Sequence, residues 1–313
     1  MSYNWVPIFG EFLWSKASVS FAGNETKLNQ DLSGRPVVPA GLCLSDQRFN
    51  EGTITASIRF DTIQPETTAE IVLYYDMISR DTMTIGIGGN GVLFSARYFE
   101  GKTAQWKHLQ GGGTKSSLRT DHEYRLSIRL RGSFVTMTLD GVDVISLPMP
   151  MQTPLSQVGV FSISSGAVYF DDIVISSDQP KAFIVMQFTP EYNELYSDVI
   201  RPVCEQAGLL AFRADDTYSP GVVISDIGKQ IQEAKVVIAE ITPSNPNVYY
   251  EVGFAHALGK PTILIADKTL SRLPFDISSF RTLFYENSIG GKKKIEEGLR
   301  RYLENFSQMP KAA

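Results

Sequence analysis

Cysteine and histidine are scarce in this chain of 313 residues. It has two cysteines and three histidines, and Cys43 and Cys204 lie in stretches with different patterning. Neither a disulfide framework nor a thiolate metal site has enough ligands. We therefore expect a reducing compartment and no bound metal.

Dense basic stripes and long apolar runs are also missing. The net charge is −5, and no window carries the concentration of Lys and Arg that neutralises nucleic-acid phosphates. The one basic run, Lys292–Lys294, follows two glycines at a predicted helix start, which is typical of a solvated helix end. No signal-peptide pattern and no run of about 18 apolar residues occurs. We expect a cytoplasmic protein that binds neither nucleic acid nor membrane.

Length and composition indicate two globular domains. A single domain commonly has ~100–200 residues. A hydrophobic content of 43% with 20% charged residues is too apolar for a disordered chain. The hydrophobic period changes after Asp178-Gln179-Pro180. We predict one domain over residues 1–178 and a second over residues 179–313.

The first domain has the pattern of an antiparallel β-sandwich. Short runs with a period of two alternate with glycine and polar turns, as in Thr53–Phe60, Tyr124–Leu130 and Val135–Leu139. Asp140-Gly141 after the last of these runs is a strong hairpin signal. Many half-buried strands of this kind predict a sandwich or a barrel.

The closing strands of this domain carry a resemblance to a known family. Gly159–Ser164 and Gly166–Ile175, with Phe170-Asp171-Asp172, resemble the end of a concanavalin A-like lectin/glucanase jelly roll of the laminin-G-like kind. The resemblance implies an all-β jelly roll that binds glycans or proteins or hydrolyses glucans. A glucanase needs two carboxylates flanking the scissile bond. Because Glu66 and Glu70 fall in a loop-like stretch, we expect recognition rather than hydrolysis.

An aromatic cluster in the first domain has two interpretations. Tyr98, Phe99 and Trp106 precede the run Gly111–Gly113. They form either a rim that stacks on a sugar ring, or part of the core beside a mobile hairpin tip. We favour the second interpretation, because aromatic side chains are most often buried.

The second domain alternates strand and helix patterns. Continuous apolar runs predict strands buried on both faces, at Ala182–Met186, Leu209–Phe212, Val236–Ala239 and Thr262–Ile265. Amphipathic stretches predict helices from Thr189-Pro190 onward, with a kink at Pro202, and at Val223–Ala234, Asn247–Leu258 and Ile295–Phe306. The alternation predicts a doubly wound α/β domain, Rossmann-like or flavodoxin-like, with ligands at the carboxyl ends of a parallel sheet.

The most informative stretch of this domain is Val237–Pro261. It contains Asn245-Pro246-Asn247-Val248, Tyr249-Tyr250-Glu251, Gly253 and Gly259-Lys260-Pro261. Together with Phe183–Phe188, Arg213–Asp216 and Ile224–Ala234, it resembles the nucleoside 2-deoxyribosyltransferase-like and TIR-like superfamily. The resemblance covers most of residues 181–267. It implies cleavage or transfer at an N-glycosidic bond, with Glu251 at the position of the family's functional glutamate.

Physical chemistry supports a catalytic role for Glu251. The residue lies in the first two turns of a helix that follows a buried strand, where the crevice of an α/β sheet opens. The helix dipole is expected to favour its ionised form. Cleavage of an N-glycosidic bond places positive charge on the anomeric carbon, which a fixed carboxylate stabilises or attacks. The alternative is a glutamate that only accepts a hydrogen bond from a capping group.

Five predicted substrate-binding residues follow the ends of three strands. Gln187 and Phe188 end the first strand and are placed to bond to and stack on a base. Asp215 and Asp216 follow the second strand and are placed to hold ribose hydroxyls or a base amino group, with a solvated turn as the alternative. Glu240 ends the third strand, where it either orients the sugar or braces the next loop.

Four more predicted binding residues lie next to helix starts. Asn245 is expected to cap the catalytic helix, with Pro246 first in the helix and Asn247 facing the crevice. Ser219 and Gly221 are placed to offer backbone amides to a phosphate.

Two other polar residues of the stretch are assigned structural roles. His256 lies five residues after Glu251, about 140° around the helix, and is expected to pack. Lys260 follows the end of the same helix and is expected to serve its dipole.

The loop before Glu251 decides between branches of the superfamily. The deoxyribosyltransferases usually carry an Asp-x-Gly-Thr-type loop, whereas this chain has Asn245–Val248. That version resembles the TIR-like effector domains of bacterial defence systems, which implies removal of nicotinamide from NAD. Nicotinamide leaves as a neutral base from a cationic nucleoside, so no strong general acid is required.

We therefore predict a TIR-like N-glycosidase that cleaves the nicotinamide–ribose bond of NAD or a related nucleotide in bacterial antiphage defence. NAD is the substrate, and no cofactor is expected. A lectin-like first domain is expected to gate the activity by binding a glycan, protein or small-molecule activator, in a homo-oligomer. The alternatives are a nucleoside 2-deoxyribosyltransferase, a nucleoside 5′-phosphate N-hydrolase, and a non-enzymatic protein that senses nucleotides or binds glycans.

Overall fold

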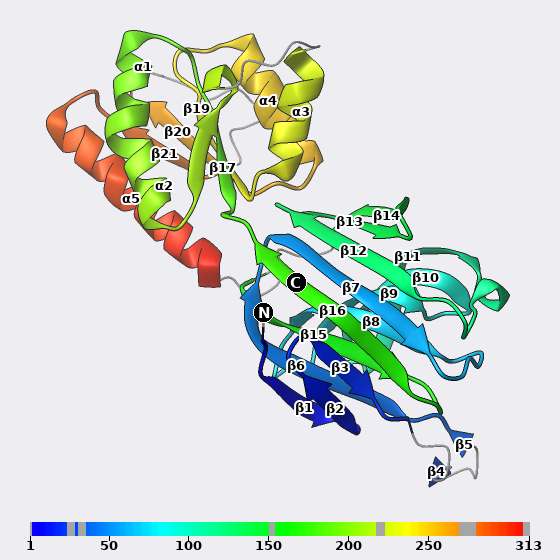
Figure 1. Ribbon diagram of the computed structural model, residues 1–313. Helices are drawn as coiled ribbons and strands as arrows, with labels where there is room; N and C mark the ends of the chain where they lie inside the picture. The colour runs from blue at the N-terminus through cyan, green and yellow to red at the C-terminus, as the bar shows by residue number, and fades with distance from the viewer. Residues whose placement is uncertain are drawn as a thin grey trace. The chain divides into compact units, whose positions relative to one another are not determined.

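The computed structural model describes residues 2–23, 29–30, 36–149, 154–216, 223–268 and 280–308 (Figure 1). The chain divides into two compact units. Residues 1–130 with 135–178 form the first, called here the β-sandwich unit, and residues 131–134 with 179–313 form the second, the α/β unit. No helix within the described ranges is long and apolar enough to cross a membrane.

Two antiparallel sheets of seven strands form the β-sandwich unit. The first sheet runs in the order β1 (Trp5–Phe9), β6 (Ala40–Phe49), β15 (Ser156–Ile163), β8 (Thr68–Tyr75), β9 (Thr82–Gly88), β10 (Val92–Glu100) and β11 (Gln105–Thr114). The second runs in the order β14 (Val142–Pro148), β13 (Phe134–Leu139), β12 (Tyr124–Arg131), β7 (Gly52–Phe60), β16 (Val168–Ser177), β3 (Ser18–Phe21) and β2 (Phe12–Ser15). A short pair, β4 (Asn29–Gln30) and β5 (Pro36–Val37), and a 3-10 turn, η1 (Lys115–Ser117), complete the unit. The predicted all-β jelly roll is confirmed.

The period-two patterns explain how these strands form a core. On β12, Tyr124, Leu126 and Ile128 are buried in the core between the sheets and alternate with more exposed residues. The β13–β14 hairpin turns at Asp140 (φ 51°) and Gly141 (φ 81°). A tight turn of this kind needs left-handed backbone at both central positions, which an Asp-Gly pair accepts readily. The predicted hairpin is therefore confirmed.

Two local predictions in this unit are wrong. Gly111–Gly113 do not form a hairpin tip, because they lie within β11, where Gly112 pairs with Phe94 of β10. A Cβ at Gly111 would lie 2.7 Å from the carbonyl oxygen of Phe94, so close strand approach accounts for glycine there. Glu70 does not lie in a loop either. It belongs to β8, is fully buried, and accepts hydrogen bonds from Arg97 Nε (2.8 Å) and Nη2 (2.5 Å).

The α/β unit has a five-stranded parallel sheet. Its order is β18 (Leu210–Arg213), β17 (Lys181–Val185), β19 (Val236–Glu240), β20 (Thr262–Asp267) and β21 (Thr282–Tyr285). The helices are α1 (Pro190–Leu195), the π-helical turn η2 (Tyr196–Ile200), α2 (Arg201–Gln206), the 3-10 turn η3 (Ala214–Asp216), α3 (Val223–Glu233), α4 (Pro246–Ala257) and α5 (Ile289–Gln308). The four predicted strands are present. The fifth, β21, was missed because it lies at the sheet edge and only Tyr285 is fully buried.

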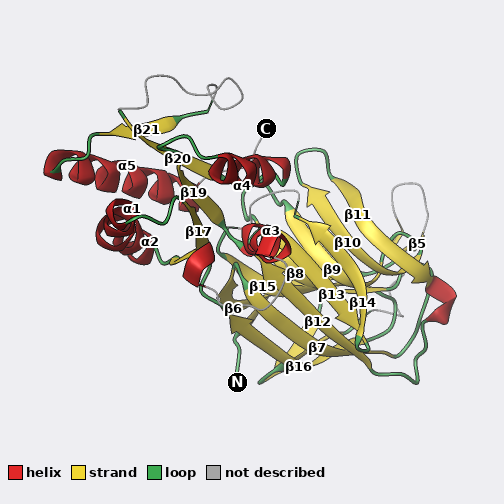
Figure 2. Ribbon diagram, turned by 90° about the horizontal axis from the view of Figure 1, so that it is seen from above, coloured by secondary structure: helices red, strands yellow, loops and turns green. Residues whose placement is uncertain are grey.

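Helices cover both faces of this sheet (Figures 1 and 2). Side chains of β17 and of Met186, which follows it, alternate between the two layers. Ala182, Ile184 and Met186 pack in the cluster that contains α1, α2 and α5 residues, and Phe183 and Val185 pack against α3 and α4. This two-sided burial explains the continuous apolar run in the sequence.

The first helical segment is interrupted as expected. Pro190 is the first residue of α1, and Asn193 N donates a 2.9 Å hydrogen bond to the carbonyl of Thr189. The helix then widens into the π-turn η2 directly before α2, whose second residue is Pro202. Proline has no amide to donate to the preceding turn, so the regular hydrogen-bond ladder cannot continue through it.

The strand order places a ligand crevice in this unit. β17 lies between β18 and β19, so the connections that leave β17 and β18 run to opposite sides of it. Open α/β sheets bind ligands at such a switch point, outside the carboxyl ends of the strands. For this chain the expected location is beside Gln187 after β17 and the loop after β19.

Candidate functional site

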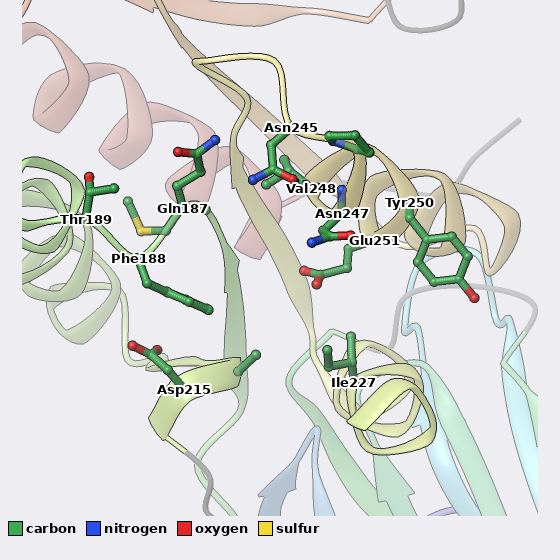
Figure 3. Close-up of a pocket in the computed structure, with 13 residues that line it drawn as sticks. Gln187, Phe188, Thr189, Asp215, Ile227, Asn245, Asn247, Val248, Tyr250 and Glu251 are labelled. Atoms are coloured by element: carbon green, nitrogen blue, oxygen red, sulfur yellow. Dashed lines mark hydrogen bonds between the residues drawn. The ribbon is translucent and has the colours of Figure 1, made fainter. Parts of the chain in front are cut away.

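A cavity of about 930 Å³ opens at the expected switch point (Figure 3). Its walls come from the segment after β17, the turn after β18, one residue of α3, and the first turns of α4. Six of the predicted site residues line it together: Glu251, Gln187, Phe188, Asp215, Asn245 and Asn247.

The start of α4 positions Glu251 in this cavity. Asn245 has extended backbone (φ −129°), and its side chain accepts a 2.9 Å hydrogen bond from Asn247 N. Pro246 is the first helical residue, and Gly259 (φ 64°) follows the helix end. These are the caps that the sequence predicted. The helix therefore begins at a fixed residue, which sets the direction of Glu251.

Glu251 is a half-buried carboxyl without a partner among the described residues. Figure 3 shows the carboxylate directed into the cavity. Burial raises its pKa to about 7. The expectation that the helix dipole favours the ionised form is wrong. Glu251 is the sixth residue of α4 counted from Pro246, beyond the first turn in which the dipole acts, so the loss of solvation dominates.

Phe188 presents an exposed aromatic ring to the same cavity. Its side chain is 53% exposed, and Figure 3 shows the ring and the Glu251 carboxylate directed into the same space. The guanidinium carbon of Arg213 lies 5.1 Å from the centroid of this ring and 4.6 Å from that of Tyr196. An aromatic face that is free on one side suits the stacking of a planar base.

Arg213 is a site residue to which the sequence assigned no role. It is 6% exposed and ends β18. Its Nε and Nη2 donate to the two carboxylate oxygens of Asp215 at 2.9 and 2.5 Å, and Nη1 donates to Asn193 Oδ1 at 2.7 Å. Both carboxylate oxygens of Asp215 are therefore occupied, and the side chain is held in place. The sequence did contain a signal for this role, namely an arginine at the end of a predicted buried strand, two residues before an aspartate.

Glu240 lies outside the cavity. It is 1% exposed, and its Oε1 accepts a 2.8 Å hydrogen bond from Thr242 N. Burial raises its pKa to about 8, and Asp267 adds repulsion. Of the two predicted roles, bracing the loop after β19 agrees with this geometry. Orientation of the sugar does not, because the side chain is enclosed at the sheet end.

Three predicted binding residues remain without described side chains. Ser219 and Gly221 lie outside the described residues. Asp216 ends η3, but only its backbone belongs to the described part. Their assignment stays a prediction.

The structure agrees with the role predicted for His256 but not with that predicted for Lys260. His256 stacks on Phe280 with ring centroids 4.0 Å apart and burial lowers its pKa, which agrees with a packing residue. The backbone N of Lys260 donates a 2.9 Å hydrogen bond to the Ala255 carbonyl at the end of α4, but its charged group binds at a different helix. Its Nζ donates to the carbonyls of Gln232 (2.5 Å) and Ala234 (2.8 Å), at the end of α3, because the buried side chain reaches that neighbouring terminus. The prediction for Lys260 is wrong in the choice of helix.

The chemistry available in the cavity is that of one carboxyl beside an aromatic face. Asp215 is already paired with Arg213, so Glu251 is the acidic group that can act on a ligand. Within the described ranges, no three His, Cys, Asp or Glu side chains gather closely enough to hold a metal ion. The arrangement fits electrostatic or nucleophilic catalysis at a cationic carbon.

Comparisons with known proteins concern the fold. No family model matches the chain, and no curated protein matches it. Among solved structures it is similar to a carbohydrate-binding module, CBM66 from Bacillus subtilis, at 14% identity and a TM-score of 0.43, over 54% of this chain and 92% of that one. It is also similar to a prokaryotic β-1,3-1,4-glucanase (lichenase) derived from a mouse hindgut metagenome, at 8% identity and a TM-score of 0.38, over 53% and 90%. The likeness of the α/β unit to the deoxyribosyltransferase-like and TIR-like superfamily stays a prediction.

Proposed function

We propose that the α/β unit is an N-glycosidase of the TIR-like type that cleaves the nicotinamide–ribose bond of NAD or a related nucleotide. One observation carries the proposal: the unpaired carboxyl of Glu251 and the exposed ring of Phe188 face the same cavity of about 930 Å³. The carboxylate acts beside the anomeric carbon, and the ring stacks on a base. A cavity of this volume has room for a nucleoside-sized group.

The charge state of Glu251 favours a cationic substrate. Because burial raises the pKa of Glu251 to about 7, an appreciable fraction of its carboxyls is protonated at neutral pH. A positive charge placed beside a carboxyl lowers its pKa. The pyridinium of NAD brings such a charge, so binding shifts Glu251 toward the anion that the reaction needs. A neutral nucleoside brings none.

Nicotinamide as the leaving group is compatible with a cavity whose described residues offer no general acid beside Glu251. Among the described lining residues, the only other carboxyl is that of Asp215, both of whose oxygens already accept hydrogen bonds from Arg213. Nicotinamide departs as a neutral base and needs no proton. The residues therefore match a reaction in which one carboxylate stabilises or captures the ribosyl cation, and water completes hydrolysis.

Two further observations support the assignment of the α/β unit. Its strand order, with the second strand at one edge and the first beside the third, is that of flavodoxin-like doubly wound sheets. Asn245 caps α4, and Asn245–Val248 carries the sequence that resembles TIR-like effectors. On that resemblance we extend the proposal to bacterial antiphage defence by a homo-oligomer in which the β-sandwich unit gates the activity.

One observation favours a nucleoside 2-deoxyribosyltransferase as the second candidate. The described residues that line the cavity include no lysine and no arginine. The described walls therefore place no cation for a phosphate, and a neutral deoxynucleoside fits them. The pyrophosphate of NAD would instead need the backbone amides predicted at Ser219 and Gly221, outside the described residues. Base exchange also needs only one nucleophilic carboxylate.

The test is mass spectrometry of small molecules after incubation with the purified full chain. One sample contains NAD, and a second contains deoxynucleosides with a free base. Wild type is compared with Glu251→Gln and with Glu205→Gln, a control on the exposed side of α2, at several protein concentrations because the proposal includes oligomers. Nicotinamide from wild type and the control, but not from Glu251→Gln, supports the proposal. Exchanged nucleosides instead would establish the transferase, and a bound nucleotide left intact would indicate a sensor.

A further inference from the structure

A second cavity lies on the β-sandwich unit, with a volume of about 710 Å³. Every strand of the first sheet contributes to it, and its walls include Leu42, Phe99, Trp106, Phe161 and Ile163. Trp106 contacts Phe99 and Phe161, with ring centroids 5.2 and 5.4 Å apart. Leu42, Phe161, Trp106 and Ile163 form a cluster separate from the core between the two sheets. The cavity is therefore an apolar site on the outer face of the first sheet.

The aromatic residues Tyr98, Phe99 and Trp106, which the sequence grouped together, lie on two faces of the first sheet. Phe99 and Trp106 line the cavity, whereas Tyr98 packs against the core between the sheets. Neither interpretation of the cluster holds for all three residues, because Tyr98 and Phe99 are adjacent on β10 and point to opposite faces.

The lining does not suit a sugar or a glycosidase. It includes no Asp, Glu, Asn, Gln or His among the described residues, and its polar side chains are few, chiefly Tyr75, Arg80 and Thr82. Glycoside hydrolysis needs two carboxylates, and binding of sugar hydroxyls needs several acceptors. Glu70 of the same sheet is already enclosed in its pair with Arg97.

Arg80 is the one charged residue among the described lining residues, and a closed turn fixes its backbone. Arg80 is exposed, and no described acidic side chain pairs with it. Its backbone is left-handed (φ 61°) within a turn that Asp76 closes: Asp76 Oδ1 accepts from Ile78 N and Ser79 N at 2.8 Å, and Arg80 N donates to the Asp76 carbonyl at 2.7 Å. A non-glycine residue keeps this backbone only where the surroundings fix it. The guanidinium therefore extends from an ordered point beside an apolar cavity.

Apolar side chains also remain uncovered at the rim. Phe9 is 47% exposed and Met77 is 68% exposed, and both line the cavity. Exposed apolar side chains around a concavity mark a binding surface. Their position next to Arg80 combines an apolar surface with one positive charge.

We propose that this cavity binds a small amphipathic anion, a molecule with an apolar and partly aromatic body and one anionic group. The body lies against Trp106, Phe161 and Ile163, and the anionic group pairs with Arg80. The volume of about 710 Å³ fits a ligand of drug-like size, buried largely in apolar walls and oriented by one or two polar groups. The proposal concerns binding alone and does not depend on the chemistry of the α/β unit.

Two fluorescent probes with the same ring system test the proposal on the full chain. 8-Anilinonaphthalene-1-sulfonate carries a sulfonate, and N-phenyl-1-naphthylamine lacks it. We expect the sulfonate to bind wild type more tightly, and Arg80→Asn to weaken its binding about fivefold, as for one exposed ion pair, while the neutral probe is unaffected. Asparagine tolerates left-handed backbone. Arg125→Asn, on β12 of the other sheet, is the matched control and leaves both probes unchanged.

Further variants separate this cavity from other sites. Ile8→Ser removes an apolar wall and is expected to weaken both probes, whereas Phe188→Ala in the α/β unit changes neither. If near-ultraviolet circular dichroism shows that Arg80→Asn is altered, Arg80→Gly repeats the test, because glycine adopts φ 61° without strain. Equal affinity of the sulfonate for wild type and the intact Arg80 variant overturns the proposal. So does displacement of the probe by a neutral oligosaccharide such as cellopentaose, or loss of binding in Phe188→Ala.

Discussion

Replacement of Glu251 by glutamine should stabilise the folded protein at alkaline pH. The carboxyl has a pKa of about 7 in the folded state, against 4.5 for an exposed glutamate, because burial penalises its charged form. Folding therefore favours the protonated form. The penalty is absent below pH 4.5, grows as the pH rises through 4.5 to 7, and is complete above 7. Glutamine has nearly the same shape and no charge, so the variant avoids the penalty.

The size of the effect follows from the shift and the exposure. An upward shift from 4.5 to about 7 corresponds to at most about 3 kcal/mol. Because the side chain is only half-buried, solvent screening reduces this to about 1–2 kcal/mol. For a unit of this size the melting temperature should rise by about 3–8 °C at pH 8.5.

The assay is differential scanning calorimetry of the full chain at pH 4 and pH 8.5. The transition that Glu251→Gln moves at pH 8.5, and not at pH 4, belongs to the α/β unit. Glu205→Gln should move no transition by a comparable amount. A Glu251→Gln variant that is equally stable to wild type at pH 8.5, or less stable there, would refute the claim that the carboxyl is buried without a partner.

Variants at Phe188, Arg97 and Lys260 test individual contacts within one unit or the other. Phe188→Ala should raise the KM for NAD about tenfold and Phe188→Trp should not, because stacking on a base contributes about 1–3 kcal/mol. Steady-state kinetics measures the KM, and equal values for wild type and Phe188→Ala would exclude stacking. Arg97→Met should lower the free energy of unfolding of the β-sandwich unit by about 3–5 kcal/mol, because the enclosed Glu70 carboxyl loses its partner. Arg97→Met together with Glu70→Met should recover most of this loss, as measured by urea unfolding. Lys260→Met should lower the free energy of unfolding of the α/β unit by about 1–3 kcal/mol, because the carbonyls of Gln232 and Ala234 lose their hydrogen bonds to Nζ. Faster amide hydrogen exchange at the end of α3 would reveal this loss.

Local patterns predicted the elements of this chain well. The continuous apolar run Ala182–Met186 gave a strand buried on both faces, and Asp140-Gly141 gave a hairpin. Asn245 and Pro246 predicted the start of α4 and so brought Glu251 to the switch point. These features depend on neighbours within a few residues, which the sequence displays directly.

Features that depend on distant residues were not accessible in the same way. The pairing of Glu70 with Arg97 joins β8 to β10, and Lys260 reaches the end of another helix. The pKa of Glu251 depends on enclosure by several segments, which the helix position alone could not reveal. Arg213 gained its role only when Phe188 and Asp215 came together around it.

The initial rate of nicotinamide release from NAD tests the central claim most directly. Wild type and Glu205→Gln should release nicotinamide at the same rate, and Glu251→Gln should be slower by about 10²–10³-fold, the loss typical of a removed electrostatic group. The rate per protein molecule should rise with protein concentration if oligomers form the active species. Equal rates for wild type and Glu251→Gln would contradict the account, as would the absence of release from NAD at every protein concentration.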